Sequence, residues 1–279
     1  MIRINGLKFN DMEFHNGEVI FEKTELIYSD CNVIEMNFKD NKDITALLFA
    51  RQWLKDKCPG ASCKLVMKYC PYERMDREIN VQLFSMKYFA EIISKFDFKK
   101  VFILDPHSEV CVDLLKNQGV DVEIISLESY VNEVIDDFKP DYIFYPDKGA
   151  AKKYPDVLSN INIPYFFGAK TRDLENKGRI KEYELVDAPD LKNKKVLIID
   201  DICCLGGTAY NAAVLMKEQG ASKVAFYISH CEEGVYAGNL LKKDEAGKYV
   251  VDKIYTADTM LINGSHENII RLRRDEVLL

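Results

Sequence analysis

Two adjacent carboxylates followed by a glycine turn are the part of the chain best equipped for chemistry. Asp200 and Asp201 follow an apolar run, and a turn with Gly206 and Gly207 leads on to Thr208. Glycines let the backbone come close to a ligand, and the first free N–H groups of a helix favour an anion. Carboxylates accept hydrogen bonds from sugar hydroxyls or hold a metal ion through water. Together these groups suit a ribose that carries a phosphate.

The elements that must position this segment are a strand before it and a helix after it. Residues 196–199 are all apolar, which is typical of a parallel strand buried on both faces, so the two acids should lie where that strand ends. Thr208 should open an amphipathic helix, and Gly220 is placed to end it. One face of this helix carries the apolar residues Ala209, Ala212, Ala213, Leu215 and Met216.

The same alternation of strand and helix runs through both halves of the chain, which predicts an α/β fold of two tandem doubly wound domains with mainly parallel sheets. Strands are expected at residues 65–69, 101–104, 122–126, 142–145, 165–168, 196–199 and 224–228, with a helix at about 81–95. We expect a first domain over 1–137 and a second over 138–265. The charged tail, 268–279, is expected to be helical, and 266–279 to pack back on the first domain.

Polar clusters follow several of these strands, and the carboxyl ends of strands are where such sheets bind ligands. The clusters begin at Cys70, Asp105, Pro146, Lys170 and Asp200.

The bulk composition fits a globular protein of two ordinary domains: 279 residues, 47% hydrophobic and 30% charged, with a net charge of -7. The acidic balance argues against a nucleic-acid partner. No apolar run is long enough to span a membrane, and the N-terminus lacks a signal-peptide pattern, so a cytoplasmic protein with eight reduced cysteines is expected. There is no C-x-x-C, and the pairs 58/63 and 203/204 lack a second cluster, so zinc is not predicted.

Taken together, the clusters resemble the ribose-phosphate diphosphokinase (phosphoribosyl pyrophosphate synthetase) family of the type I phosphoribosyltransferase fold. The matching segments are 14–18 (FHNGE), 71–77 (PYERMDR), 105–107 (DPH), 146–150 (PDKGA), 170–172 (KTR), 200–208 (DDICCLGGT) and His230. Their order along the chain is that of the family. The resemblance implies transfer of the terminal diphosphoryl group of ATP to the anomeric hydroxyl of a ribose phosphate, with release of AMP. Without this resemblance, each of these side chains would be interpreted as an ordinary core residue or as part of a solvated loop.

The resemblance also implies roles for the residues at the transferring group. His107 and Asp147 would hold the magnesium ion on the triphosphate. Lys170 and Arg172, on a mobile loop, would close over the transferring group. Because phosphoryl transfer depends on positioning and on neutralising charge, these are the expected catalytic groups. The sequence has no G-x-x-x-x-G-K-[ST] loop, so the use of ATP is indicated by the resemblance alone.

The remaining implied roles concern binding of the two substrates. Asp200 and Asp201 would hold the ribose 2- and 3-hydroxyls, with the loop of Cys204, Leu205, Gly206, Gly207 and Thr208 around the 5-phosphate. The nucleotide would contact Arg74, Met75 and Asp76, and a neighbouring subunit would supply Phe14, Asn16 and Glu18 around the adenine. A homodimer or higher homo-oligomer is therefore expected.

The sugar-phosphate loop departs from the family pattern, which usually continues Asp-Asp-x-x-Asp-Thr-x-Gly-Thr. Cys204 and Leu205 stand where the family has Asp and Thr, and Leu205 cannot donate to a phosphate oxygen. Met75, in place of the usual Gln, similarly points to a changed nucleotide pocket. Two explanations stay open: ribose 5-phosphate bound with poorer anchoring, or a 5-phosphate that is linked to something larger. ADP-ribose is such an acceptor and would connect the enzyme to NAD metabolism as well as nucleotide biosynthesis.

Two other classes of function also stay open. A non-catalytic relative that regulates an active synthetase would be expected to lose the charged groups, which this chain keeps. A phosphoribosyltransferase, which consumes activated ribose, would have one sugar-binding domain with a hood rather than two tandem sheets.

Overall fold

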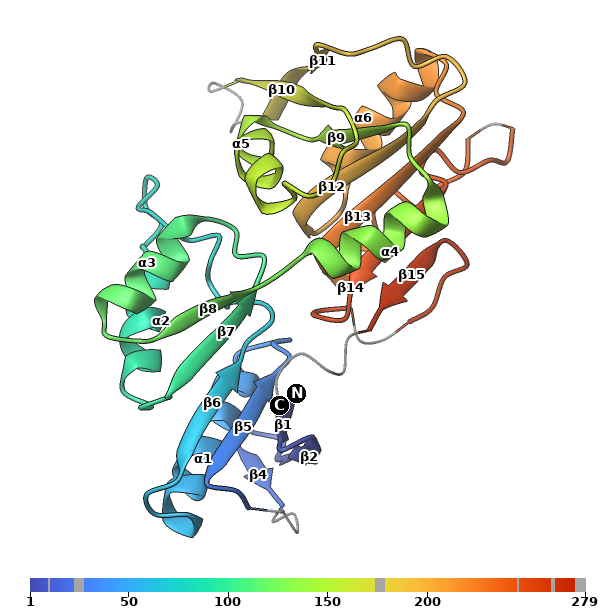
Figure 1. The fold of residues 1–279 in the computed structure, drawn as a ribbon. Coiled ribbons are helices and arrows are strands. Elements are labelled where there is room, and N and C mark those ends of the chain that lie inside the picture. Colours follow the sequence, from blue (N-terminus) through green and yellow to red (C-terminus); the bar gives the residue numbers. More distant parts are fainter. Residues whose placement is uncertain (10, 23–27, 174–178, 245, 262–263, 274–279) are drawn as a thin grey trace. The chain divides into compact units, whose positions relative to one another are not determined.

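The computed structural model describes the chain except for residues 10, 23–27, 174–178, 245, 262–263 and 274–279, and it leaves the side chains of 11 and 170–182 undescribed. The chain divides into two units, the first from Met1 to Ile125 and the second beginning at Ser126. Each unit is built on one sheet that is mainly parallel, as the sequence predicts (Figure 1).

The first unit contains a sheet with the strand order β2-β1-β5-β6-β7-β8, in which β5 to β8 are parallel and in chain order. Its strands are β1 (Ile2–Ile4), β2 (Leu7–Phe9), β5 (Cys31–Met36), β6 (Ser62–Val66), β7 (Lys100–Leu104) and β8 (Val122–Ile125). A separate hairpin is formed by β3 (Asp11–Glu13) and β4 (Val19–Phe21).

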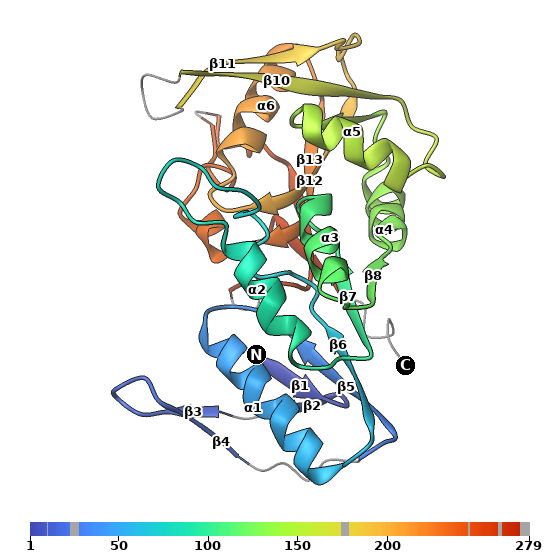
Figure 2. The ribbon, with the colours of Figure 1, turned by 90° about the vertical axis from the view of Figure 1, so that its left-hand side faces the viewer.

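Three helices of the first unit cover one face of this sheet: α1 (Lys42–Lys57), α2 (Ser85–Ser94) and α3 (Glu109–Asn117) (Figure 2). They share one buried core with the strands, in which Leu47 of α1, Phe89 of α2 and Leu115 of α3 are almost fully buried. Burial of such side chains contributes roughly 1.5–3 kcal/mol each to folding. The helices therefore hold the strand ends, and the loops that follow them, in fixed positions.

The second unit contains the other sheet, with the order β11-β10-β9-β12-β13-β14-β15. Its strands are β9 (Tyr142–Tyr145), β10 (Tyr165–Asp173), β11 (Arg179–Val186), β12 (Lys195–Cys203), β13 (Lys223–Cys231), β14 (Lys253–Ala257) and β15 (Ile269–Leu272). The order reverses between β9 and β12, which makes this the switch point of a doubly wound sheet. The helix α6 (Gly207–Glu218) covers one face, and α4 (Glu128–Phe138) and α5 (Lys148–Val157) cover the other (Figures 1 and 2).

The helix after the acids forms as the sequence predicts. Ala209, Ala212, Ala213 and Met216 of α6 are buried against the sheet, and Leu215 is half-buried. Gly220 has a φ of 91°, the left-handed conformation that ends a helix most easily when the residue lacks a side chain.

The expected end of the first domain and the expected helical tail both differ from the structure. The first unit ends at Ile125 rather than near 137, because α4 packs on the second sheet: Lys253 and Tyr255 of β14 both donate hydrogen bonds to Asp137. The expected helical tail is wrong over its first residues, since Ile269–Leu272 pairs with β14 as a parallel edge strand. Residues 274–279 lie outside the described residues, so packing of the tail on the first domain stays a prediction.

Among the described residues no helix is both long and apolar enough to cross a membrane. All eight cysteines lie in the described part of the chain, where they are free thiols.

Candidate active site

Three carboxylates of the second unit gather at the switch point of its sheet. Asp147 follows β9, and Asp200 and Asp201 lie in β12, the strand directly beside β9. Because parallel strands end at the same edge of a sheet, the acids after β9 and near the end of β12 lie at one edge of this sheet. The structure thus brings together residues predicted to hold a metal ion and a sugar.

The strand that carries the two acids is longer than the sequence predicts. It does not end at Ile199 but continues to Cys203, because Ile202 pairs with His230 and Cys203 with Cys231 on β13. Each of the two carboxylates accepts a hydrogen bond from the backbone N–H of the next residue. Asp200 accepts from the N–H of Asp201 (3.0 Å), and Asp201 accepts from the N–H of Ile202 (2.8 Å). Their orientation is therefore set by the strand rather than by a flexible loop.

The electrostatics of this cluster favour a cation. Burial, followed by the charges of Asp201 and Asp147, raises the pKa of Asp200 well above its usual 3.8. A bound divalent ion would offset the repulsion that raises this pKa. The donor set consists of carboxylate oxygens, which are the ligands Mg²⁺ prefers.

Asp147 has a structural role that the sequence analysis missed. It is the N-cap of α5, where its Oδ1 accepts a hydrogen bond from the N–H of Ala150 (3.0 Å). Asp is a preferred N-cap because its oxygen satisfies an N–H that has no partner within the helix. The carboxylate is consequently held in one orientation at the end of β9.

A tyrosine from the hairpin β10–β11 supports the loop that carries Asp147. Tyr183 of β11 donates a hydrogen bond to the carbonyl oxygen of Pro146 (2.9 Å). Burial, together with Asp147 and Asp200, raises the pKa of Tyr183, so its hydroxyl stays a donor. Gly168 of β10 lies beneath this contact, and a Cβ there would stand 2.3 Å from the Tyr183 hydroxyl. The sequence signal for this site is a lone glycine within a strand, which marks a close approach.

The predicted phosphate loop ends at the N-terminus of α6. Gly206 is the N-cap residue, with a φ of 72°, and a Cβ at this position would lie 2.0 Å from Cδ1 of Leu240. Only glycine fits there. The first N–H groups of α6 are those of a helix start and suit an anion. Cys204 and Leu205, which depart from the family pattern, are both exposed, Leu205 by 54%.

The predicted catalytic cations lie on the hairpin β10–β11. The backbone of Lys170 pairs with Tyr183, and that of Arg172 with Ile180, after an irregularity in register between Thr171 and Arg172. Their backbone is thus strand rather than loop at these positions. The side chains of Lys170 and Arg172 lie outside the described residues, so their role stays a prediction.

In the first unit, the segments after β6 and β7 are joined by hydrogen bonds. The hydroxyl of Ser108 donates to Oδ2 of Asp76 (2.9 Å), and the N–H of His107 donates to Oε2 of Glu73 (3.2 Å). Burial opposes ionisation of Asp76, but hydrogen bonds from Arg77 and Ser108 and the nearby His107 hold its pKa below 3.8. Asp76 is 5% exposed and acts within the protein as a charged anchor between the two segments.

The other predicted nucleotide residues are accessible. Arg74 and His107 are exposed, and Met75 is half-buried. Phe14, Asn16 and Glu18 form the tip of the hairpin β3–β4, where the N–H of Phe14 donates to the carbonyl of Glu18 (2.8 Å). Phe14 is 54% exposed. An exposed aromatic side chain on a hairpin tip is available to another molecule, as the predicted subunit contact requires.

The predicted site residues therefore form two groups, one in each unit. Asp147, Asp200 and Asp201 come together in the second unit, whereas Asp76 and His107 belong to the first. Tyr183, Gly168, Ser108 and Leu240 complete these groups and were not expected from the sequence.

Comparisons with known proteins agree with this arrangement. The profile of the phosphoribosyl transferase domain family matches residues 112–265, more than half of the chain. A ribose-phosphate pyrophosphokinase of Saccharolobus solfataricus is 26% identical over 200 residues, which cover 70% of this chain and 65% of that protein. One of Campylobacter jejuni is 24% identical over 266 residues, which cover 92% of this chain and 80% of that protein. A ribose-phosphate pyrophosphokinase of Pyrococcus abyssi also matches, over 60% of that protein's length. The chain therefore spans slightly less than two thirds of the Saccharolobus solfataricus and Pyrococcus abyssi proteins.

A solved structure shares the fold over almost the whole chain. Phosphoribosylpyrophosphate synthetase from Mycobacterium smegmatis superposes with a TM-score of 0.68 at 17% identity, covering 95% of this chain and 86% of that one. The chain therefore belongs to the phosphoribosyl transferase domain family, and it is similar to ribose-phosphate pyrophosphokinases.

Proposed function

We propose that the protein transfers the β,γ-diphosphoryl group of ATP to the anomeric hydroxyl of a ribose that carries a 5-phosphate. The observation that carries this proposal is the cluster of Asp147, Asp200 and Asp201 at the switch point, directly before the helix start at Gly206 and Gly207. The names of the relatives support the same reaction.

The transfer makes one bond and breaks one. The anomeric oxygen attacks the β-phosphorus, the bond from that phosphorus to the α,β-bridging oxygen breaks, and AMP leaves with the bridging oxygen. The hydroxyl proton passes to solvent. The protein lowers the activation barrier mainly by positioning the substrates and neutralising charge, and not by forming a covalent bond to them.

Each group of the chain has a defined task in this proposal. Asp200 and Asp201 bind the ribose hydroxyls, and the N–H groups at the start of α6 bind the 5-phosphate. Lys170 and Arg172 neutralise the transferring group, while Arg74 and Asp76 order the nucleotide segment. Phe14, Asn16 and Glu18 complete the adenine site of a second copy in a homo-oligomer.

Magnesium fits the oxygen-rich donor set of the second unit. In the second unit Asp147 is proposed to hold it, with Asp200 and Asp201 contributing through water, and His107 is proposed as the magnesium ligand of the first unit. When bound, Mg²⁺ neutralises the phosphate charge that builds up during transfer. The repulsion that raises the pKa of Asp200 is the structural reason to expect a cation in this place.

The exposed loop of Cys204 and Leu205 favours a second acceptor. An aliphatic side chain and a thiol offer few hydrogen-bond donors to a terminal phosphate dianion. A phosphate within a diphosphate link carries less charge and needs fewer donors around it. ADP-ribose presents a free ribose of this kind. It is our second candidate, with a role in NAD metabolism.

The test is release of AMP from ATP and Mg²⁺ with ribose 5-phosphate, with ADP-ribose and with no acceptor. Turnover with either acceptor supports diphosphoryl transfer, and the ratio of the two rates identifies the acceptor. Asp201→Asn should lose this turnover, whereas Asp190→Asn, an exposed acid elsewhere in the second unit, should keep it. Silence with both acceptors would contradict the proposal and favour a regulatory relative.

A further inference from the structure

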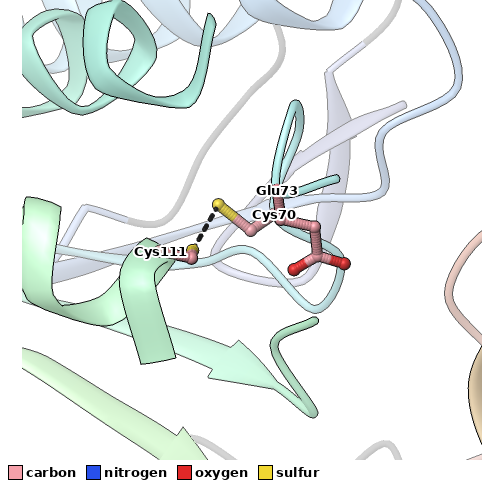
Figure 3. Close-up of side chains that lie close together, drawn as sticks. All are labelled: Cys70, Glu73 and Cys111. Carbon is pink, nitrogen blue, oxygen red and sulfur yellow. Dashed lines mark hydrogen bonds between the residues drawn. The ribbon is translucent and has the colours of Figure 1, made fainter. Parts of the chain in front are cut away.

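A cluster of sulfur and carboxylate ligands lies inside the first unit and has no part in the proposed reaction. The ligand atoms of Cys70, Glu73 and Cys111 all lie within 4.8 Å of one another, and all three residues are buried. Figure 3 shows the two thiols facing each other and joined by a hydrogen bond, with the Glu73 carboxylate on the other side of Cys70.

The cluster is built from elements that are far apart in sequence. Cys70 follows β6, and Cys111 lies in the first turn of α3; their Sγ atoms are 3.2 Å apart. Met86 of α2 adds a thioether, with its Sδ 3.9 Å from Sγ of Cys70. Three soft sulfur donors and one carboxylate thus converge from one loop and two helices, a donor set typical of zinc and other thiophilic ions.

The electrostatics of the cluster also suit a cation. Negative ligands in a buried site repel each other unless a positive charge joins them. A divalent ion would replace the thiol protons, which pass to solvent as the sulfur–metal bonds form.

We propose that Cys70, Cys111 and Glu73 bind a thiophilic divalent cation, with zinc as the best match. Tetrahedral bonds of about 2.3 Å place two sulfur ligands roughly 3.8 Å apart, so the thiols need to separate only slightly from 3.2 Å. The spacing of 3.9 Å to Met86 already matches this value. A disulfide, in contrast, requires the sulfurs to close to about 2.05 Å.

The site has a consequence for the nucleotide segments. Glu73 belongs to the 71–77 segment and directly precedes Arg74, and its carboxylate accepts a hydrogen bond from the N–H of His107. A metal ion at this position would hold the segment after β6 against the segment after β7. It would act as a structural cross-link, distinct from the magnesium of the proposed reaction and independent of whether that reaction is assigned correctly.

The experiment measures metal content directly. The full chain is unfolded with a reductant and a chelator, refolded with or without zinc, separated from free metal, and analysed for zinc by mass spectrometry. We expect stoichiometric zinc in the wild type and in Cys63→Ser, a matched control because Cys63 is also buried in the first unit but lies outside the cluster. Cys111→Ser should lose the bound zinc.

A spectroscopic measurement keeps the test valid if Cys111→Ser does not fold. Cobalt added to the wild type should give a thiolate-to-cobalt charge-transfer band, and Glu73→Gln, which keeps both thiols, should weaken cobalt binding. Folded wild type with neither zinc nor this band would overturn the proposal. So would equal zinc in Cys111→Ser, or a mass lower by two hydrogens with loss of two thiols, which would identify a disulfide instead.

Discussion

The contact between Gly168 and Tyr183 gives a prediction that can be worked out from the structure. In Gly168→Ala the new Cβ would lie 2.3 Å from the hydroxyl oxygen of Tyr183, 2.7 Å from its Cζ and 2.9 Å from the carbonyl oxygen of Pro146. Contacts this short are not tolerated, so the ring must move. Movement breaks the hydrogen bond to Pro146, worth about 1 kcal/mol, and forced packing adds roughly 1–3 kcal/mol. The free energy of unfolding should fall by about 2–4 kcal/mol.

The same change should lower activity, because Pro146 directly precedes Asp147. We would measure urea unfolding by circular dichroism and AMP release for Gly168→Ala, Tyr183→Phe, Tyr183→Ala and the double variants. Tyr183→Ala removes the two closest atoms, so Gly168→Ala should be less costly in that background, with a coupling energy of about 1 kcal/mol or more. The only tryptophan, Trp53, lies in α1 of the first unit, and its native emission should be the same in all variants.

Two results would refute this reasoning. If Gly168→Ala were as stable and active as the wild type, the close approach would not exist in solution. If it were equally costly with and without the Tyr183 ring, then the carbonyl of Pro146, and not the tyrosine, would be what excludes a side chain at Gly168.

Three further predictions concern the proposed reaction. Because the folded-state pKa of Asp200 is raised above 3.8, its ionisation removes stability as the pH rises from 3.8 through the raised value. Asp200→Asn should therefore be more stable than the wild type at pH 7 without Mg²⁺, with a difference that disappears near pH 3.8; urea unfolding across pH checks this, and a less stable variant at pH 7 would contradict it. Lys170→Ala should reduce turnover a few hundredfold, equivalent to about 2–4 kcal/mol, with an unchanged dichroism spectrum; full activity would show that this cation has no catalytic role. Leu205→Thr, which restores a hydroxyl donor, should lower the KM for ribose 5-phosphate relative to that for ADP-ribose, and an unchanged ratio would exclude this loop as the determinant of the acceptor.

The parts of the fold that could be predicted are those in which local pattern and tertiary packing agree. Residues 142–145 were expected as a strand and form β9, and α6 forms where its apolar stripe and Gly220 indicate. The length of β12 was not predictable, because Asp200 and Asp201 are poor strand formers and pairing with β13 carries the strand past them. The tail was expected to be helical because it is rich in charged residues. Three apolar residues within it instead pair with β14 at the edge of the sheet, a tertiary contact that the local sequence does not show.

The site could be predicted in part because acids at strand ends are visible in the sequence. What could not be predicted are contacts between segments that are distant in the chain. Ser108 meets Asp76, Tyr183 meets Pro146, and Cys111 meets Cys70 only once the sheets have formed. The last of these also explains why the spacing of the cysteines along the chain does not indicate the cluster of Cys70, Glu73 and Cys111.

The packing of α4 on the second sheet decides where this chain could be divided. Tyr130, Val131, Val134 and Phe138 of α4 are buried, and Asp137 accepts hydrogen bonds from Lys253 and Tyr255. A gene split after codon 137 would leave these partners on separate polypeptides and expose an apolar sheet face. A split at codon 125 keeps the helix with its sheet, so complementation between co-expressed halves should succeed at 125 and fail at 137.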